Sequence, residues 1–254
     1  MDYPFKEIEH RIYKNTFLQN TFVEIQYESI KDRLSIKDVF SDLQHFALES
    51  FNINIEKEKA ITENGVVISS QEMAIDFYIT NKRLIIKIGR KNYKTFKESV
   101  IPYIKIAKTF IESVAKLDKI QSCEIRKINI WPYSNIASKR TLTETLMGKI
   151  FSKELLENGN FKSQIPENQN VTQWMNEKVF KGEYSSLKLK YGFIAKDENH
   201  DKERIILDSS IEMLQPTDLS DIEDVFNQLN TILFNAYHWS ITEQIIQIMS
   251  REVE

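Results

Sequence analysis

The stretch that decides the fold is MAIDFYITNKRLIIKIG, residues 73–89. Apolar side chains occupy every second position before and after a polar pair, Asn81-Lys82, which is typical of a turn. The apolar set consists of Ile75, Phe77, Ile79, Leu84, Ile86 and Ile88. A period of two is the spacing of strands with one buried face. The stretch therefore predicts an antiparallel pair of strands, with Arg83 and Lys87 turned to the opposite face.

The rest of the chain alternates between this period and the helical one. Strands are predicted at Phe22–Glu28, Ala60–Ser69, Met73–Thr80, Arg83–Gly89, Gln121–Trp131, Val171–Phe180, Ser186–Ile194 and Arg204–Leu214. Helices are predicted from Ser35 to Ala47, from Thr95 to Val114, from Thr141 to Gly159 and from Asp218 to Met249. Written out, the order β-α-β-β-β-α occurs twice.

Several local signals refine these boundaries. Thr95 with Glu98, and Thr141 with Glu144, have the spacing of a capping box. Pro102 predicts a kink or a true helix start near Ser99, and a break at Ser240 is expected in the last helix. Asp218 is expected to cap that helix. A slip in the apolar phase at Arg126-Lys127 predicts a β-bulge.

Together these patterns predict an α+β protein made of two consecutive units, residues 1–120 and 121–254. The two units are expected to share one curved antiparallel sheet with helices on one face. This arrangement resembles the saddle of the TATA-binding protein, and the resemblance concerns the fold alone.

Composition indicates an ordinary globular protein. Hydrophobic residues make up 41% and charged residues 28% of the 254 residues. The first ten residues lack the apolar run of a secretory signal, and no stretch has the roughly 20 apolar residues of a membrane helix. A single cysteine, Cys123, excludes an internal disulfide and a cysteine-based zinc site. We expect a cytoplasmic protein that does not enter a membrane.

Motifs of common catalytic sites are absent from the sequence. There is no Gly-x-Gly, no P-loop and no Gly-x-Ser-x-Gly elbow, and no lysine follows an acidic residue by two positions. The four histidines are widely separated, and Cys123 is expected to be a buried thiol. A polar cluster at 197–208 suits a solvated hairpin tip better than a metal site. The sequence therefore favours a non-enzymatic protein without a cofactor or a metal.

Charge is unevenly distributed along the chain. Residues 82–140 hold fifteen Lys and Arg against four Asp and Glu, a balance of +11, whereas residues 197–254 hold three against thirteen, a balance of −10. Such separation either marks a face for an anionic partner or lets the two halves attract each other. The candidate binding residues of the basic part are Arg83, Lys87, Arg90, Lys91, Lys94 and Lys97.

Short motifs over nearly the full length resemble a sporadically distributed bacterial protein family of unknown function. They are Tyr13-Lys14-Asn15 leading into Val23-Glu24-Ile25, Ile125-Arg126-Lys127-Ile128-Asn129, Ile206-Leu207-Asp208, and a last helix with Leu229, Phe234 and Ser240-Ile241-Thr242. The resemblance implies carriage by mobile elements, as for defence or immunity proteins. It singles out Arg126, Asn129 and Asp208, either as a functional set or as a structural Arg-Asp pair with an asparagine at the bulge.

Two hypotheses on function follow. The first is a non-enzymatic binding protein that acts with a partner protein and uses the curved sheet or the basic residues. The second is a nucleic-acid-binding component of a defence or mobile-element system. Salt-dependent binding distinguishes them, because phosphate contacts weaken steeply with ionic strength.

Overall fold

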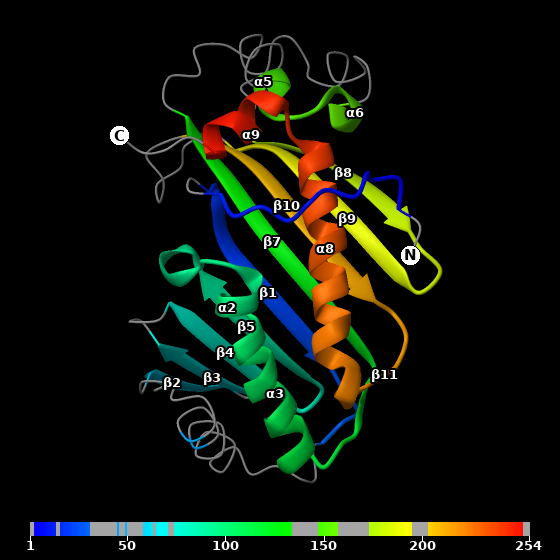
Figure 1. Ribbon diagram of the computed structural model, residues 1–254. Coiled ribbons are helices and arrows are strands. Elements are labelled where there is room, and N and C mark those ends of the chain that lie inside the picture. Colours follow the sequence, from blue (N-terminus) through cyan, green and yellow to red (C-terminus); the bar gives the residue numbers. More distant parts are fainter. Residues whose placement is uncertain are drawn as a thin grey trace.

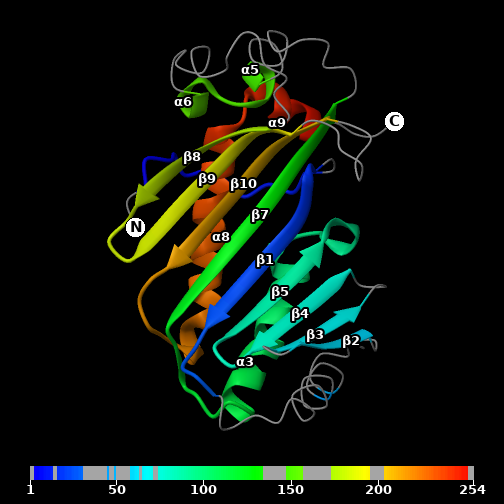
Figure 2. The same cartoon turned by 180° about the vertical axis from the view of Figure 1, so that it is seen from behind.

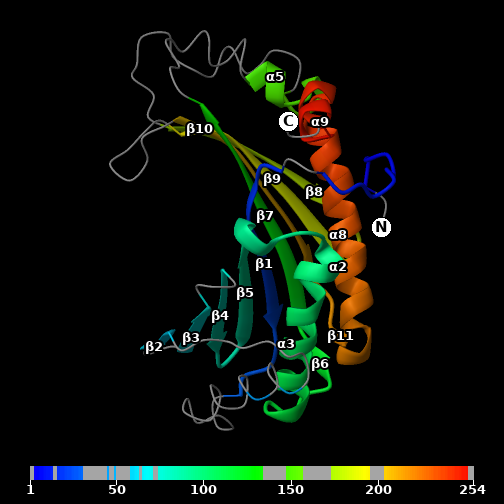
Figure 3. The same ribbon diagram turned by 60° about the vertical axis from the view of Figure 1, so that its left-hand side comes forward.

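The computed structural model arranges the chain in two layers, an antiparallel sheet and a layer of helices (Figure 1). It describes residues 3–13, 16–30, 58–62, 65–70, 74–133, 147–156, 173–194 and 203–250, together with His45 and Glu49. Seen from its edge, the sheet is curved, with α3 (Ile101–Ser113) and α8 (Ile222–Ser240) on the same side (Figure 3). The predicted fold class, a curved antiparallel sheet with helices on one face, is confirmed.

Nine strands form the main sheet. They are β1 (Leu18–Gln26), β2 (Glu58–Thr62), β3 (Gly65–Ser70), β4 (Ile75–Thr80), β5 (Arg83–Gly89), β7 (Ser122–Tyr133), β8 (Gln173–Lys181), β9 (Ser185–Ile194) and β10 (Glu203–Met213). Their order across the sheet is β2-β3-β4-β5-β1-β7-β10-β9-β8. From the central pair outward, one side reads β1, β5, β4, β3 and the other β7, β10, β9, β8. Strands of residues 1–120 thus lie on one side of the β1–β7 junction and strands of residues 121–254 on the other.

The predicted pair of strands at 73–89 forms as β4 and β5, in antiparallel register. Leu84, Ile86 and Ile88 are buried beneath the helices, and Arg83 is exposed. One predicted strand was wrong. Residues 60–69 form two strands, β2 and β3, which pair with each other on either side of residues 63–64. The sequence Asn64-Gly65 is typical of a turn and was predicted as one, but residues 60–69 were still predicted as a single strand; the chain reverses between the paired residues Thr62 and Gly65.

The predicted bulge at Arg126-Lys127 was also wrong. Strand β7 pairs with β10 in unbroken register from Cys123 to Tyr133. The irregularity lies on the neighbouring strand β1, between Leu18 and Asn20. The apolar phase of β7 slips because polar residues occupy helix-facing positions of a regular strand.

Helix boundaries follow local signals in most places. Thr95 accepts a hydrogen bond from the backbone N–H of Glu98 at 3.1 Å and begins α2 (Phe96–Ser99), after the 3₁₀ turn η1 (Arg90–Asn92). The chain breaks at Val100 before α3, as Pro102 predicted; proline fits there because the first turn has unpaired N–H groups. The predicted break at Ser240 separates α8 from α9 (Glu243–Ser250).

Two helix predictions differ from the structure. In place of one helix from 141 to 159, the described residues form α5 (Gly148–Ile150) and α6 (Lys153–Leu156), separated by Phe151, which bridges to Ile241. The capping pair Thr141 and Glu144 and most of the predicted helix 35–47 lie outside the described residues. Asp218 makes no capping hydrogen bond: it ends β11 (Thr217–Asp218), which pairs with β6 (Lys119–Ile120), and the 3₁₀ turn η3 (Leu219–Asp221) follows.

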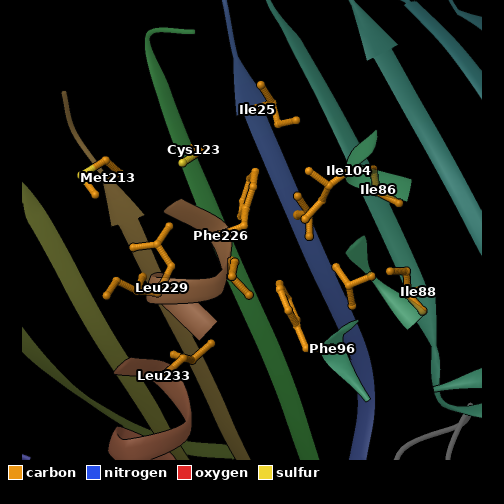
Figure 4. Close-up of a cluster of buried hydrophobic side chains, with 14 of the residues drawn as sticks. Ile25, Ile86, Ile88, Phe96, Ile104, Cys123, Met213, Phe226, Leu229 and Leu233 are labelled. Atoms are coloured by element: carbon orange, nitrogen blue, oxygen red, sulfur yellow. The ribbon is translucent and has the colours of Figure 1, made fainter. Parts of the chain in front are cut away.

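The core lies between the sheet and the helices. Figure 4 shows Ile25 and Ile86 of the sheet, Ile104 of α3 and Phe226 of α8 directed into one cluster. All four are fully buried. None of the helices in the described part of the chain is long and apolar enough to cross a membrane.

Candidate binding surface

The face of the sheet turned away from α3 and α8, seen from behind in Figure 2, is named here the open face. None of the described helices covers it. Its side chains come from alternate positions of the strands, and include Phe22, Glu24, Arg83, Lys87, Glu124, Arg126, Ile128, Ile130, Val179, Lys190, Ile206 and Asp208. The face therefore mixes apolar side chains with both signs of charge.

Arg126 and Asp208 form an ion pair with two hydrogen bonds on the open face. Nε and Nη2 of Arg126 donate to the two carboxylate oxygens of Asp208 at 2.7 and 2.6 Å. The guanidinium also lies 5.6 Å from the ring centre of Phe22 on the opposite side. The hydrogen bonds that Arg126 donates to Asp208 raise the pKa of Arg126, so this cation stays charged beside its carboxylate partner.

Three further cations of the open face each form a single contact with a carboxylate. Lys87 lies 2.9 Å from Asp76, Lys190 lies 3.5 Å from Glu177, and Arg83 lies 3.8 Å from Glu24. The Lys87 pair joins directly opposed residues of β4 and β5. Each pair lowers the positive charge that the sheet presents to a ligand.

The six basic residues predicted as one face lie in two places. Arg83 and Lys87 lie on the open face, as the period of β5 predicted. Arg90, Lys91, Lys94 and Lys97 are exposed in the segment from η1 to α2, at one end of the sheet. None of these four forms an ion pair with another residue that the structure describes.

Ion pairs also join the basic segment 82–140 to the acidic segment 197–254. Lys105 pairs with Glu223 at 3.4 Å, and Lys119 pairs with Asp218 at 3.2 Å.

The three polar residues predicted to act together are also separated. Arg126 and Asp208 meet on the open face, but Asn129 lies on the opposite face, 5% exposed, beside a cavity under the helices. Lys127 and Ser209 lie on that same helix-covered face, in register with each other. Our sequence reasoning passed over Lys127 and Ser209. The slip in the apolar phase of β7 could have indicated Lys127, because it arises where polar side chains occupy positions that face the helices.

A row of glutamates crosses the centre of the open face. Glu24 of β1 is directly opposite Glu124 of β7, and Glu124 is directly opposite Glu212 of β10. Burial raises the pKa of Glu124; the Ser210 hydroxyl lowers it by hydrogen bonding, and the two flanking carboxylates raise it further. Like charges on opposed strand positions are destabilising.

We expect Glu124→Gln to raise the free energy of unfolding by about 1 kcal/mol at pH 7. An acid whose pKa is raised by folding destabilises the fold once it ionises, so the gain should grow from near zero at pH 3 as the pH rises through the folded pKa. Urea titrations at several pH values measure this. Glu177→Gln, in an exposed pair with Lys190, is the matched control and should change stability by less than about 0.5 kcal/mol. An equal gain at pH 3 and pH 7 would contradict the explanation.

The single cysteine does not have the environment of a nucleophile. Cys123 is 1% exposed on the helix-covered face of β7. Burial raises the pKa of its thiol to about 12, with a smaller contribution from Glu212. A thiol of that pKa stays protonated near neutral pH. No group of three potential metal ligands occurs among the described residues; the polar cluster at 197–208 is described only from residue 203.

Comparison with known proteins assigns the chain to no family. No family model and no curated protein match the chain. Among solved structures, TBP of Methanococcus jannaschii is similar at 11% identity, with a TM-score of 0.27, over 85% of this chain and 96% of that one. A structure described as KH domains is similar at 12% identity, with a TM-score of 0.18, over 89% of this chain and 63% of that one. The resemblance to a bacterial family stays a prediction.

Proposed function

We propose that the protein is a non-enzymatic binding protein that acts with a partner protein through the open face of its sheet. The observation that supports this most is the pairing of cations with carboxylates beside apolar side chains on that face. Ile128, Ile130 and Ile206 are half-buried there, and Val179 is 45% exposed. Protein interfaces combine apolar side chains with charges of both signs in this way.

The same pairing disfavours nucleic acid as the ligand of the open face. Phosphate backbones are bound by cations whose counterions are released. Here Arg126 would have to leave the Asp208 carboxylate, which holds it at 2.6–2.7 Å, and the glutamate row would repel phosphate. A protein partner can instead extend the existing pairs into a network and cover the apolar side chains.

Site-specific photo-crosslinking tests this proposal. A benzoylphenylalanine replaces Ile128 on the open face in the native cells, and a matched variant carries it at Thr231, which is exposed on α8 on the other side of the molecule. We expect one discrete protein adduct at position 128 that withstands nuclease treatment, with no such adduct at position 231. Arg126→Glu, made together with the probe at 128, should lower its yield several-fold, because the Asp208 pair becomes a repulsion.

Other outcomes decide against the proposal. A nuclease-sensitive adduct at 128 supports the nucleic-acid hypothesis instead. An adduct with a second copy of the chain assigns the face to self-association. The same adducts at positions 128 and 231 would show that the open face has no special role.

A further inference from the structure

A cavity of about 490 Å³ lies under the helices, on the side of the sheet opposite the open face. Its floor is formed by β1, β7 and β10, and its walls by α2 with the residues just before it, α8, α9, N-terminal residues 10–13 and Thr16. Cavities of 300–1,000 Å³ are typical of sites for small organic molecules. The size and the lining by seven separate segments suit a ligand rather than water alone.

The floor of the cavity carries a lysine without a counterion. Nζ of Lys127 donates to the side-chain oxygen of Asn230 at 2.7 Å and lies 5.6 and 5.8 Å from the ring centres of Phe96 and Tyr93. No carboxylate among the described residues forms an ion pair with it. Its ammonium has three donors, of which the described residues accept one. Burial lowers the pKa of Lys127 to about 8, because no nearby anion offsets the lost hydration.

Two neutral groups beside Lys127 are directed into the same cavity. Asn129 lies two residues along β7 and Ser209 lies opposite Lys127 on β10, so all three side chains are on one face. The Ser209 hydroxyl donates to the carbonyl of Lys127 at 3.3 Å. No hydrogen bond joins the Asn129 amide to another described residue. The floor thus offers one cation and an amide donor within a small area.

The remaining walls are apolar. Leu233 and Phe234 of α8, Met249 of α9 and Phe96 of α2 line the cavity above the polar floor. The exposed residues that line it form its rim, and they are His10, Arg11, Ile12, Lys94 and Glu98. Lys94 belongs to the exposed basic segment from η1 to α2, so part of this segment lies at the entrance of the cavity. A group of exposed cations raises the rate at which anions associate with a site.

From this arrangement we infer a binding site for an amphipathic carboxylate with a single negative charge. The carboxylate accepts hydrogen bonds from Lys127 and Asn129, and its aromatic or aliphatic body packs against Phe96, Phe234 and Leu233. One half-buried cation under the helices matches one negative charge, whereas a phosphate dianion would leave charge unpaired among apolar walls, which is costly. The site lies on the opposite side of the sheet from the open face and does not depend on the partner protein.

Calorimetric titration of the full chain tests the inference with matched ligands. Naphthalene-2-carboxylate and the neutral naphthalene-2-carboxamide have the same body and differ in charge, and inorganic phosphate has the charge without the body. We expect the carboxylate to bind at least ten-fold more tightly than the amide and phosphate to bind weakly. For the wild-type protein, affinity for the carboxylate should fall between pH 7 and pH 9.5, as Lys127 loses its proton.

Lys127→Met should abolish the preference for the carboxylate over the amide. Lys97→Met should keep that preference, because Lys97 is an exposed lysine of the segment from η1 to α2 and does not line the cavity. A thermal melt establishes that each variant is folded. If Lys127→Met does not fold, the wild-type comparison of carboxylate with amide and its pH dependence still decide. Equal affinity for carboxylate and amide, phosphate binding as tight as the carboxylate, unchanged preference in folded Lys127→Met, or no binding of either naphthalene ligand would overturn the inference.

Discussion

Gly192→Val is expected to lower the free energy of unfolding by about 3 kcal/mol and to detach β8 from the sheet. Gly192 lies on β9 opposite Met175 of β8. A Cβ at this position would meet the carbonyl oxygen of Trp174 at 2.0 Å and the Cα of Met175 at 2.8 Å. Both are backbone atoms, so no side-chain rotation relieves the clash. Only a glycine allows the two strands to approach this closely.

The loss should appear as a lower midpoint in urea denaturation and as faster amide hydrogen exchange in β8, an edge strand. Gly148→Ala is the control, because a Cβ there meets nothing within 4 Å. That change should be neutral or slightly stabilising, since alanine favours a helix over glycine. A Gly192→Val protein as stable as the wild type would show that β8 and β9 are spaced more widely than described.

Acid should loosen the N-terminal segment through His238. The imidazole Nε2 lies 2.8 Å from the Tyr13 hydroxyl, and the ring is 8% exposed. Burial, with smaller contributions from the nearby charges of Arg11 and His10, lowers the pKa of His238 to about 4. Tyr237 and Phe234 pack against its ring and carry no charge that would favour protonation.

The sign follows from linkage. A histidine whose pKa is lowered by folding stabilises the fold fully above its unfolded pKa of about 6.5, and this contribution is lost as the pH falls toward 4. Between pH 7 and pH 4.5, the wild type should lose about 2 kcal/mol more stability than His238→Gln, which cannot take up the proton. Denaturant titration at the two pH values measures the difference.

His45→Gln is the control, because His45 is exposed and pairs with Glu49. It should leave the acid loss of the wild type unchanged. Since residues 10–13 form one wall of the cavity, binding of a carboxylate should weaken over the same pH range. The same loss of stability in His238→Gln as in the wild type would place the acid sensitivity elsewhere.

Some features of the fold could be predicted from local sequence because their causes are local. The alternation in Met73–Gly89 specified a pair of strands and the face that each side chain takes, since successive residues of a strand point to opposite sides. The hydroxyl of Thr95 and the ring of Pro102 placed a helix start, since capping and the missing proline N–H act within one turn.

Other features depended on contacts between distant segments. Lys127 looked like part of a bulge because a charged residue seldom faces the core, and only the docking of α8 provided Asn230, 103 residues away, as its partner. The sequence predicted one basic surface, but carboxylates on the same face of the sheet pair with two of its residues, Arg83 with Glu24 and Lys87 with Asp76.

By itself the sequence therefore determined the periods, the turns and caps, and the two-layer α+β class, all of which arise from neighbours a few residues apart. Only the tertiary structure decided which polar side chains share a face, which cations are paired and where a cavity remains. Pairing and cavities depend on how strands and helices meet across 80 residues or more, as for Arg126 with Asp208, and no local pattern encodes that distance.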